Sequence, residues 1–189
     1  MKRKERFSFH SRRKSIENIF VWRRIKMTIT TINQTNREKV KLFFQAHWGS
    51  PEMVLSTGIY DCSTLEGCMV CNETQEIIGL ITYIIRDSEC EIISLDSLIE
   101  GKGIGTTLLN MVEEIAGKMG CNKIKLITTN DNLLALKFYQ KRGYYFSELL
   151  VGAVKEARKI KPEIPLLGND GIPIRDEIVL VKKLADNVQ

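Results

Sequence analysis

The sequence predicts one α/β domain built on a central mixed, mostly antiparallel sheet with helices on both faces. Its length of 189 residues suits a single domain of ordinary size with a real hydrophobic core. Short β-branched runs alternate with two helical patterns in the second half of the chain, over residues 104–119 and 133–142. In the first half, the strand-like runs 68–71 and 77–85 are separated by a polar turn, and we therefore expect them to pair antiparallel.

The first half predicts a strand, a helix and then the antiparallel strands. Thr28–Ile32 is strand-like, and Asn36 can cap the helix that follows. His47–Pro51 breaks this helix, and Met53–Tyr60 is a loop or a short strand. After the antiparallel pair, a polar turn leads into a strand over Cys90–Leu95.

The second half alternates helices with strands. Gly120 ends the long helix, and Lys123–Thr129 is a strand. Asn132 can cap the next helix, which Gly143 ends. The remaining expected elements are a strand over 144–151, a short helix over 154–160, a Pro/Gly-rich loop over 161–173 and a last strand over 177–182.

The positive charge of the chain is concentrated at its beginning. Residues 1–26 contain ten Lys/Arg and two Glu, a net charge of +8, which leaves −3 for residues 27–189 out of a total of +5. We expect residues 1–26 to be a basic, disordered extension; a targeting peptide and an anchor for an anionic surface are the alternatives. A nearly neutral body gives no support for nucleic-acid binding. No apolar run approaches the roughly 20 residues of a membrane span.

Five cysteines, an odd number, and the lack of an evident secretory signal indicate a reduced, cytoplasmic protein. Cys68 and Cys71 have the C-x-x-C spacing of some metal and redox sites. There is no second such pair, and the chain contains two histidines. Residues three apart in a strand point to opposite faces, so no metal site is predicted.

A glycine-rich turn joins the strand that ends near Leu95 to the long helix. Gly101, Gly103 and Gly105 let the backbone approach a ligand closely, and the free N–H groups of the helix start favour an anion such as phosphate. The dinucleotide fingerprint fails because Leu108 stands where its third glycine is required, and no P-loop string occurs.

The turn resembles the acetyl-CoA loop of the GCN5-related N-acetyltransferases (GNAT), written Gln/Arg-x-x-Gly-x-Gly/Ala. Gly103 and Gly105 match it, and Glu100 departs from it, so we expect this carboxylate to point away from the phosphates or to be paired. A second hallmark of the family, Asn-x-x-Ala-x-x-x-Tyr followed by Gly-Phe/Tyr, resembles the string from Asn132 to Tyr144, NLLALKFYQKRGY. The resemblance covers about residues 28–184, and it identifies residues 27–189 as an N-acetyltransferase domain.

The resemblance implies a GNAT fold whose sheet is splayed at the acetyl-CoA site, with acetyl-CoA as the co-substrate that donates the acyl group. Strand backbone would bond the pantetheine amides, and the N–H groups of the glycine turn would hold the pyrophosphate. The residues expected to bind the donor are Ile93, Ser94, Leu95, Gly101, Lys102, Gly103, Ile104, Gly105, Thr106 and Asn132.

The resemblance also implies the catalytic groups. Tyr139 stands at the position of the general acid, and a phenol is protonated at pH 7. Glu91 is the expected base. It shares a strand face with Glu89, and Asp96 is the second choice. A backbone N–H near Leu95 would polarise the thioester carbonyl.

The implied activity is acetyl transfer to a primary amine by direct attack in a ternary complex. A small-molecule amine is expected to bind near His47, Trp48 and Tyr60 and near the segment 161–176. The string 171–177, which overlaps the end of that segment, either closes the amine pocket or is the turn before the last strand. Ile127 stands where some protein N-terminus acetyltransferases carry glutamate, and this difference argues against that subclass. A protein or peptide acetyltransferase and a catalytically silent acyl-CoA-binding module are the alternatives, and homodimerisation is left open.

Overall fold

The structure is a computed structural model that describes residues 18–22 and 25–184. Its helices and strands are, in chain order, β1 (Asn18–Trp22), β2 (Ile25–Thr31), α1 (Arg37–Trp48), β3 (Glu52–Leu55), β4 (Gly58–Asp61), β5 (Glu66–Cys71), β6 (Ile77–Arg86), β7 (Glu89–Ser97), α2 (Ile104–Lys118), β8 (Lys123–Thr129), α3 (Leu133–Gln140), β9 (Tyr145–Leu150), α4 (Ala153–Ile160) and β10 (Glu177–Lys183).

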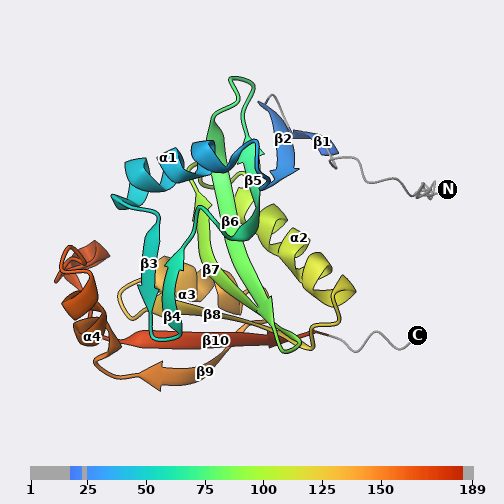
Figure 1. The fold of residues 1–189 in the computed structure, drawn as a ribbon. Helices are drawn as coiled ribbons and strands as arrows, with labels where there is room; N and C mark the ends of the chain where they lie inside the picture. The colour runs from blue at the N-terminus through green and yellow to red at the C-terminus, as the bar shows by residue number, and fades with distance from the viewer. Residues whose placement is uncertain (1–17, 23–24, 185–189) are drawn as a thin grey trace.

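One eight-stranded sheet organises the described part of the chain, in the order β1-β2-β5-β6-β7-β8-β10-β9 (Figure 1). Its neighbouring strands are antiparallel except β7 and β8, which are parallel because the chain crosses over through α2 between them. The short strands β3 and β4 form a separate hairpin. The expected mixed, mostly antiparallel sheet is confirmed.

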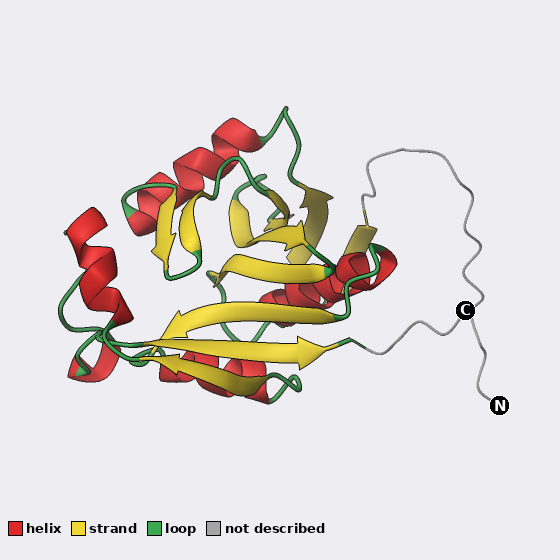
Figure 2. Cartoon of the chain, turned by 60° about the horizontal axis from the view of Figure 1, so that its bottom comes forward, coloured by secondary structure: helices red, strands yellow, loops and turns green. Residues whose placement is uncertain are grey.

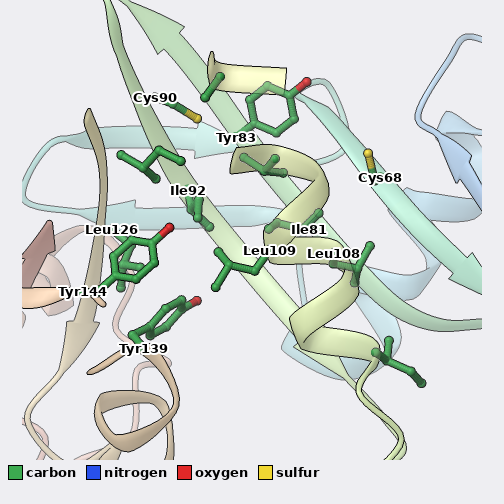
Figure 3. Close-up of a cluster of buried hydrophobic side chains, with 14 of the residues drawn as sticks. Cys68, Ile81, Tyr83, Cys90, Ile92, Leu108, Leu109, Leu126, Tyr139 and Tyr144 are labelled. Atoms are coloured by element: carbon green, nitrogen blue, oxygen red, sulfur yellow. The ribbon is translucent and has the colours of Figure 1, made fainter. Parts of the chain in front are cut away.

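Helices cover both faces of the sheet (Figure 2). On one face, Phe44 of α1 packs with Leu80 of β6 in a buried core. On the other face, Leu108 and Leu109 of α2 pack with Ile81, the next residue of β6, and α3 adds its own side chains (Figure 3). Successive strand residues point to opposite faces, so a strand with apolar residues on both faces, such as β6, supplies both cores.

The cysteines of the C-x-x-C string lie in different cores. Cys68 packs on the α2 side of the sheet and Cys71 on the α1 side, as the strand periodicity predicts. All five cysteines are buried free thiols. Among the helices of the described residues, none is long and apolar enough to cross a membrane.

The beginning of the domain differs from the expectation. The first strand was expected at 28–32, whereas β2 begins at Ile25 and pairs with β1, which lies within the segment expected to be a disordered extension. Residues 1–17 and 23–24 of that segment lie outside the described residues. Because the β1–β2 pair spans the boundary at residue 26, the division of the chain there stays a prediction.

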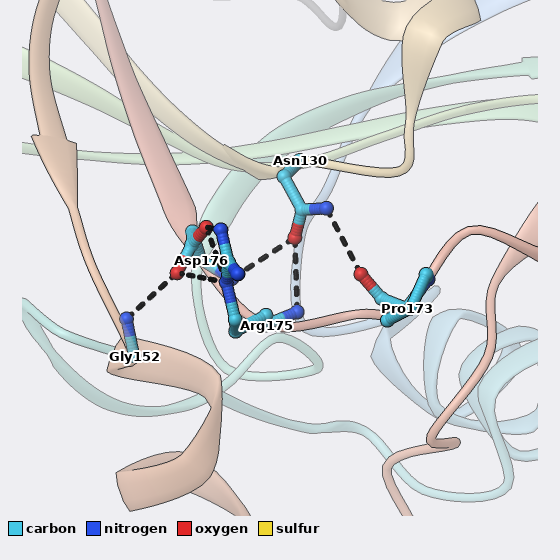
Figure 4. A network of polar contacts seen from close by, with 5 residues as sticks. All are labelled: Asn130, Gly152, Pro173, Arg175 and Asp176. Carbon is cyan, nitrogen blue, oxygen red and sulfur yellow. Dashed lines mark hydrogen bonds and ion pairs between the residues drawn. The ribbon is translucent and has the colours of Figure 1, made fainter.

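The last strand is inserted between β8 and β9 and is held there by a polar network (Figure 4). Asn130, directly after β8, accepts hydrogen bonds from the backbone N–H groups of Arg175 and Asp176, both 2.9 Å long. Asp176 Oδ1 accepts from the backbone N–H of Gly152 at 2.8 Å. The string before β10 is therefore the turn that leads into the last strand, which was one of its two expected roles.

Candidate active site

The strands β7 and β8 separate at the middle of the sheet. They pair only between Glu89–Ile92 and Lys123–Leu126, although β7 continues to Ser97 and β8 to Thr129. From residue 93 onward, this edge of β7 has no strand partner among the described residues. The splay implied by the resemblance is confirmed, and the gap between the two diverging strands forms a slot along this edge of β7.

A β-bulge lies at the point of separation. Thr82 is opposite Ser94 and Tyr83 is opposite Ile92, so Ile93 has no partner on β6. An extra residue shifts the side-chain alternation by one position. Beyond the bulge, side chains that regular alternation would place under α2 instead face α1.

Leu95 directs its backbone into the slot. The N–H of Leu98, just beyond β7, donates to the carbonyl of Ile78 at 2.9 Å, so the backbone of Leu98 faces β6. Backbone direction alternates along a strand, so every second residue before Leu98, including Ser94, also has its N–H and C=O groups directed toward β6. The N–H and C=O groups of Leu95 and Ser97 then face the opposite way. Of the residues expected to bond pantetheine, Leu95 has its backbone groups free, whereas the backbone of Ser94 faces β6.

The glycine turn has the backbone that an anion site needs. Gly101 and Gly103 have φ angles of 69° and 75°, in the left-handed region that favours glycine, and a Cβ at either would meet nothing within 4 Å. Gly103 is the N-cap of α2 and provides no capping side chain. The first N–H groups of α2 are therefore free to bind a ligand.

The slot and the glycine turn open onto one cavity of about 500 Å³. Predicted site residues that line it are Leu95, Gly101, Gly103, Ile104, Gly105, Thr106, Asn132 and Tyr139. Ile93, Ser94, Lys102 and Glu91 do not line it. Asn132 also caps α3, because its Oδ1 accepts from the N–H of Ala135 at 3.1 Å. The structure thus brings the two family motifs together in a single cavity.

Arg142 also lines the cavity and was missed by the sequence reasoning. Its guanidinium carbon lies 3.6 Å from the centroid of the Phe138 ring, and a hydrogen bond joins it to Thr106. Its Nε is buried without a partner among the described residues. The helical spacing of Phe138 and Arg142, one turn apart, is the signal that could have found it. Glu100 lines the same cavity, and the expectation that its carboxylate points away from the phosphates or is paired stays a prediction.

Tyr139 is buried at the inner wall of the cavity, with 7% of its surface exposed. Its ring packs edge-on against Phe138 and, as Figure 3 shows, lies beside that of Tyr144. Burial raises the pKa of its phenol, and the negative charge of Asp96 raises it further. The phenol therefore remains protonated throughout the physiological pH range, as a proton donor requires.

Glu91 lies on the α1 face, in a second cavity of about 500 Å³ that Tyr60 and Lys125 also line. Thr57 in the β3–β4 turn donates a 2.6 Å hydrogen bond to its Oε1, and the Lys125 ammonium lies 3.6 Å from its Oε2. Lys125 also pairs with Glu89, so the two glutamates share a face as expected. Both oxygens of Glu91 are engaged.

Asp96 lies beyond the bulge on the α1 face of the sheet, between Leu95 and Ser97, which both line the first cavity; Asp96 itself lines neither cavity. The indole Nε1 of Trp48 donates to its Oδ1 at 3.0 Å. Its Oδ2 is buried and has no hydrogen-bond partner among the described residues. Burial raises the pKa of this carboxyl from 3.8 to about 6, against the smaller lowering by Trp48 and by the charge of His47.

Comparison with known proteins agrees with this geometry. A sequence profile of the Acetyltransferase (GNAT) family matches residues 33–144, more than half of the chain. The chain belongs to the GNAT family. The uncharacterized protein YxbD of Bacillus subtilis (strain 168) is 57% identical over 158 residues, which are 84% of this chain and 99% of that protein.

Solved GNAT structures share the fold. An IAA acetyltransferase from Bacillus cereus ATCC 14579 aligns with a TM-score of 0.64 and 21% identity, over 84% of this chain and 99% of that one. A Bacillus subtilis acetyltransferase in complex with CoA aligns with a TM-score of 0.60 and 20% identity, over 85% of this chain and all of that one. The expected GNAT fold and N-acetyltransferase class are therefore confirmed.

Proposed function

We propose that this GNAT enzyme transfers the acetyl group of acetyl-CoA to a primary amine of a small molecule by direct attack in a ternary complex. The observation that carries the proposal is the slot between β7 and β8, which leads from the free backbone of Leu95 to the glycine turn and is flanked by Tyr139. A slot of this kind suits an extended, amide-bearing arm that ends in a phosphate group. A solved relative of this fold contains CoA.

The donor would bind in two parts. Pantetheine amides would pair with the C=O of Leu95 and with the backbone of Ser97 as an added strand would, which leaves the N–H of Leu95 for the thioester. The pyrophosphate would accept hydrogen bonds from the N–H groups between Gly101 and Thr106, at the positive end of α2. Arg142 would add a cation at the same end of the cavity, which offsets the unfavourable carboxylate of Glu100.

The chemistry follows from this pose. A neutral amine attacks the thioester carbonyl, the C–N bond forms, and the N–H of Leu95 stabilises the oxyanion. The C–S bond then breaks, its electron pair leaves on sulfur, and Tyr139 supplies the proton that makes the free thiol.

A small acceptor is supported by the way the α1 face is enclosed. Glu177 at the start of β10 accepts a hydrogen bond from the N–H of Ser56 in the β3–β4 turn, 3.1 Å long. Lys161, after α4, donates to Ser50 Oγ at 3.1 Å and to the carbonyl of Glu52 at 2.7 Å. A hairpin tied to β10 at its turn and to the segment after α4 at its start favours a closed pocket over an open peptide groove.

We also propose a cytoplasmic location and a catalytic domain that begins at residue 27. Five buried free thiols suit a reducing, cytoplasmic location. The catalytic domain is residues 27–189, and we expect the chain without residues 1–26 to retain its turnover. A loss of turnover on deletion, with the fold intact by circular dichroism, would assign these residues to the site.

The test is acetyl-CoA-dependent thiol release by the full chain against amines, amino acids, polyamines, aminoglycosides and peptides. We expect turnover with at least one small amine and none with peptides. Turnover with peptides alone would move the assignment to the protein acetyltransferases. Tight acetyl-CoA binding without turnover on any amine would instead support a catalytically silent binding module.

A further inference from the structure

We propose that Asp96, and not Glu91, accepts the proton of the acceptor amine. The proposal rests on the proposed function, because it assigns the base of that same reaction. Three observations support it. Asp96 is placed by the bulge in β7, one of its oxygens has no partner among the described residues, and both oxygens of Glu91 already have partners.

The β-bulge gives Asp96 its position. Glu91 and Asp96 are five residues apart, and regular alternation would put them on opposite faces. With Ile93 as the extra residue, both face α1: Glu91 bonds to Thr57 and Asp96 to Trp48. Asp96 directly follows the residue whose N–H would hold the oxyanion, so it is at the reacting end of the slot.

The two oxygens of Asp96 have different surroundings. Oδ1 is held by the indole of Trp48 at 3.0 Å, which fixes the carboxylate. Oδ2 is buried and has no partner among the described residues. A buried acceptor without a donor is costly, and buried polar atoms in native proteins are nearly always satisfied. An N–H of a bound amine is the kind of donor that would satisfy it.

Asp96 and Tyr139 lie on opposite faces of the sheet, but the charge of Asp96 still acts on Tyr139. Tyr139 belongs to the core with α2, and Asp96 bonds to the end of α1. The charge of Asp96 nevertheless raises the pKa of the Tyr139 phenol. The slot thus has a candidate base on one side and a candidate acid on the other, which suits an amine that attacks from the α1 face.

Glu91 is the weaker candidate on geometry. Its Oε1 already accepts from Thr57, and its Oε2 faces the ammonium of Lys125. Its hydrogen bond also anchors the β3–β4 turn, which gives Glu91 a structural role in place of a catalytic one.

The proton balance is complete. The neutral amine nitrogen attacks the carbonyl carbon and gives one N–H proton to Asp96 Oδ2 as the C–N bond forms. The C–S electron pair leaves on sulfur, which takes the proton of Tyr139. Solvent then carries a proton from Asp96 to Tyr139, so that amine and thioester become amide and thiol.

Among the described residues, three titratable groups interact electrostatically with Asp96: His47 on α1, Cys62 after β4 and Tyr139 on α3. Burial raises the pKa of Cys62 to about 12 and also raises that of Tyr139, so both stay neutral near pH 6. His47 is the remaining neighbour, and the H47Q variant tests its contribution to the profile.

The experiment is the pH profile of kcat/KM for an amine that the full chain acetylates. We expect a rising limb with a midpoint near pH 6 in the parent, and we expect D96N to lose it and to fall about 10²- to 10³-fold at pH 7.5. D96E keeps a carboxylate and should retain the limb at a reduced rate. H47Q, E91Q and E148Q, an exposed carboxylate on β9, should also retain the limb.

A second readout does not need turnover. In a W22F background, Trp48 is the single tryptophan of the chain, and its fluorescence should titrate with a midpoint near pH 6 that D96N abolishes. Survival of the limb in D96N, or its loss in E91Q, would overturn the base assignment alone. Lack of turnover with every amine would refute the proposed function, and the base assignment with it.

Discussion

The indole of Trp48, at the end of α1, donates a 3.0 Å hydrogen bond to Asp96 near the end of β7. This bond links the first helix to the splayed strand, two elements that are far apart in the sequence. It holds the carboxylate on the α1 face of the sheet while 49% of the Trp48 surface stays exposed. The carboxylate of Asp96 is thus oriented by Trp48, a side chain that is exposed enough for the acceptor amine to contact as well.

Trp48→Phe removes the donor and keeps an aromatic ring. The hydrogen bond lowers the pKa of Asp96, so its loss should raise that pKa above about 6. A base must be ionised to act, so the rising limb of kcat/KM should move to higher pH. The pH profile measures this shift, and an unchanged midpoint would show that Trp48 only packs against the site.

Tyr139→Phe removes the phenol and keeps the ring that packs against Phe138 and Tyr144. Loss of a proton donor to the leaving sulfur should lower kcat about 10²-fold or more, whereas the Kd of acetyl-CoA should remain nearly unchanged. Steady-state kinetics and calorimetry separate the two effects. Tyr145→Phe, at an exposed position of β9, is the matched control. Equal turnover in Tyr139→Phe and the parent would remove Tyr139 from the mechanism.

Gly103→Ala tests the glycine turn. Gly103 and Gly120 have φ angles of 75° and 78°, and a Cβ at either would meet nothing within 4 Å. Alanine at each position should therefore lower the free energy of unfolding by a similar amount, about 1 kcal/mol. Only Gly103 lies in the donor cavity, so only Gly103→Ala should weaken acetyl-CoA binding. Urea unfolding and calorimetry on both variants check this, and equal affinities would argue against an anion site at the turn.

Arg142→Ala tests the cation that the sequence reasoning missed. If Arg142 pairs with a phosphate of the donor, its loss should raise the Kd of acetyl-CoA about 10-fold and weaken the salt dependence of binding. Lys141→Ala removes the same charge from the neighbouring residue, which does not line the cavity. The same Kd in both variants would assign Arg142 to packing on Phe138.

Much of the donor side follows from local sequence. A strand, a turn with glycines at positive φ and an amphipathic helix must occur in that order, because few residues other than glycine adopt such a backbone. The second motif at its proper distance adds Asn132 as a helix cap, and Tyr139 follows two turns later. Both motifs therefore indicated the cavity and its main residues before any contact was known.

The acceptor side could not be predicted in the same way. The hairpin β3–β4 was expected as a loop or a short strand because its four-residue strands are too short for a clear alternation. The insertion of β10 beside β8 depends on a hydrogen bond between Asn130 and the backbone N–H of Arg175, which is 45 residues later in the chain. No local sequence pattern predicts such a contact.

Propensity and spacing along the chain are local properties, and they suffice for the order of the elements, the anion-binding turn and the family. The bulge at Ile93 is set by the register of β7 against β6, which is a pairing of two strands. That one extra residue places Glu91 and Asp96 on the same face, and contacts from three other elements then decide which of them is free. Lys125 and Thr57 engage Glu91, whereas Trp48 holds one oxygen of Asp96 and leaves the other open.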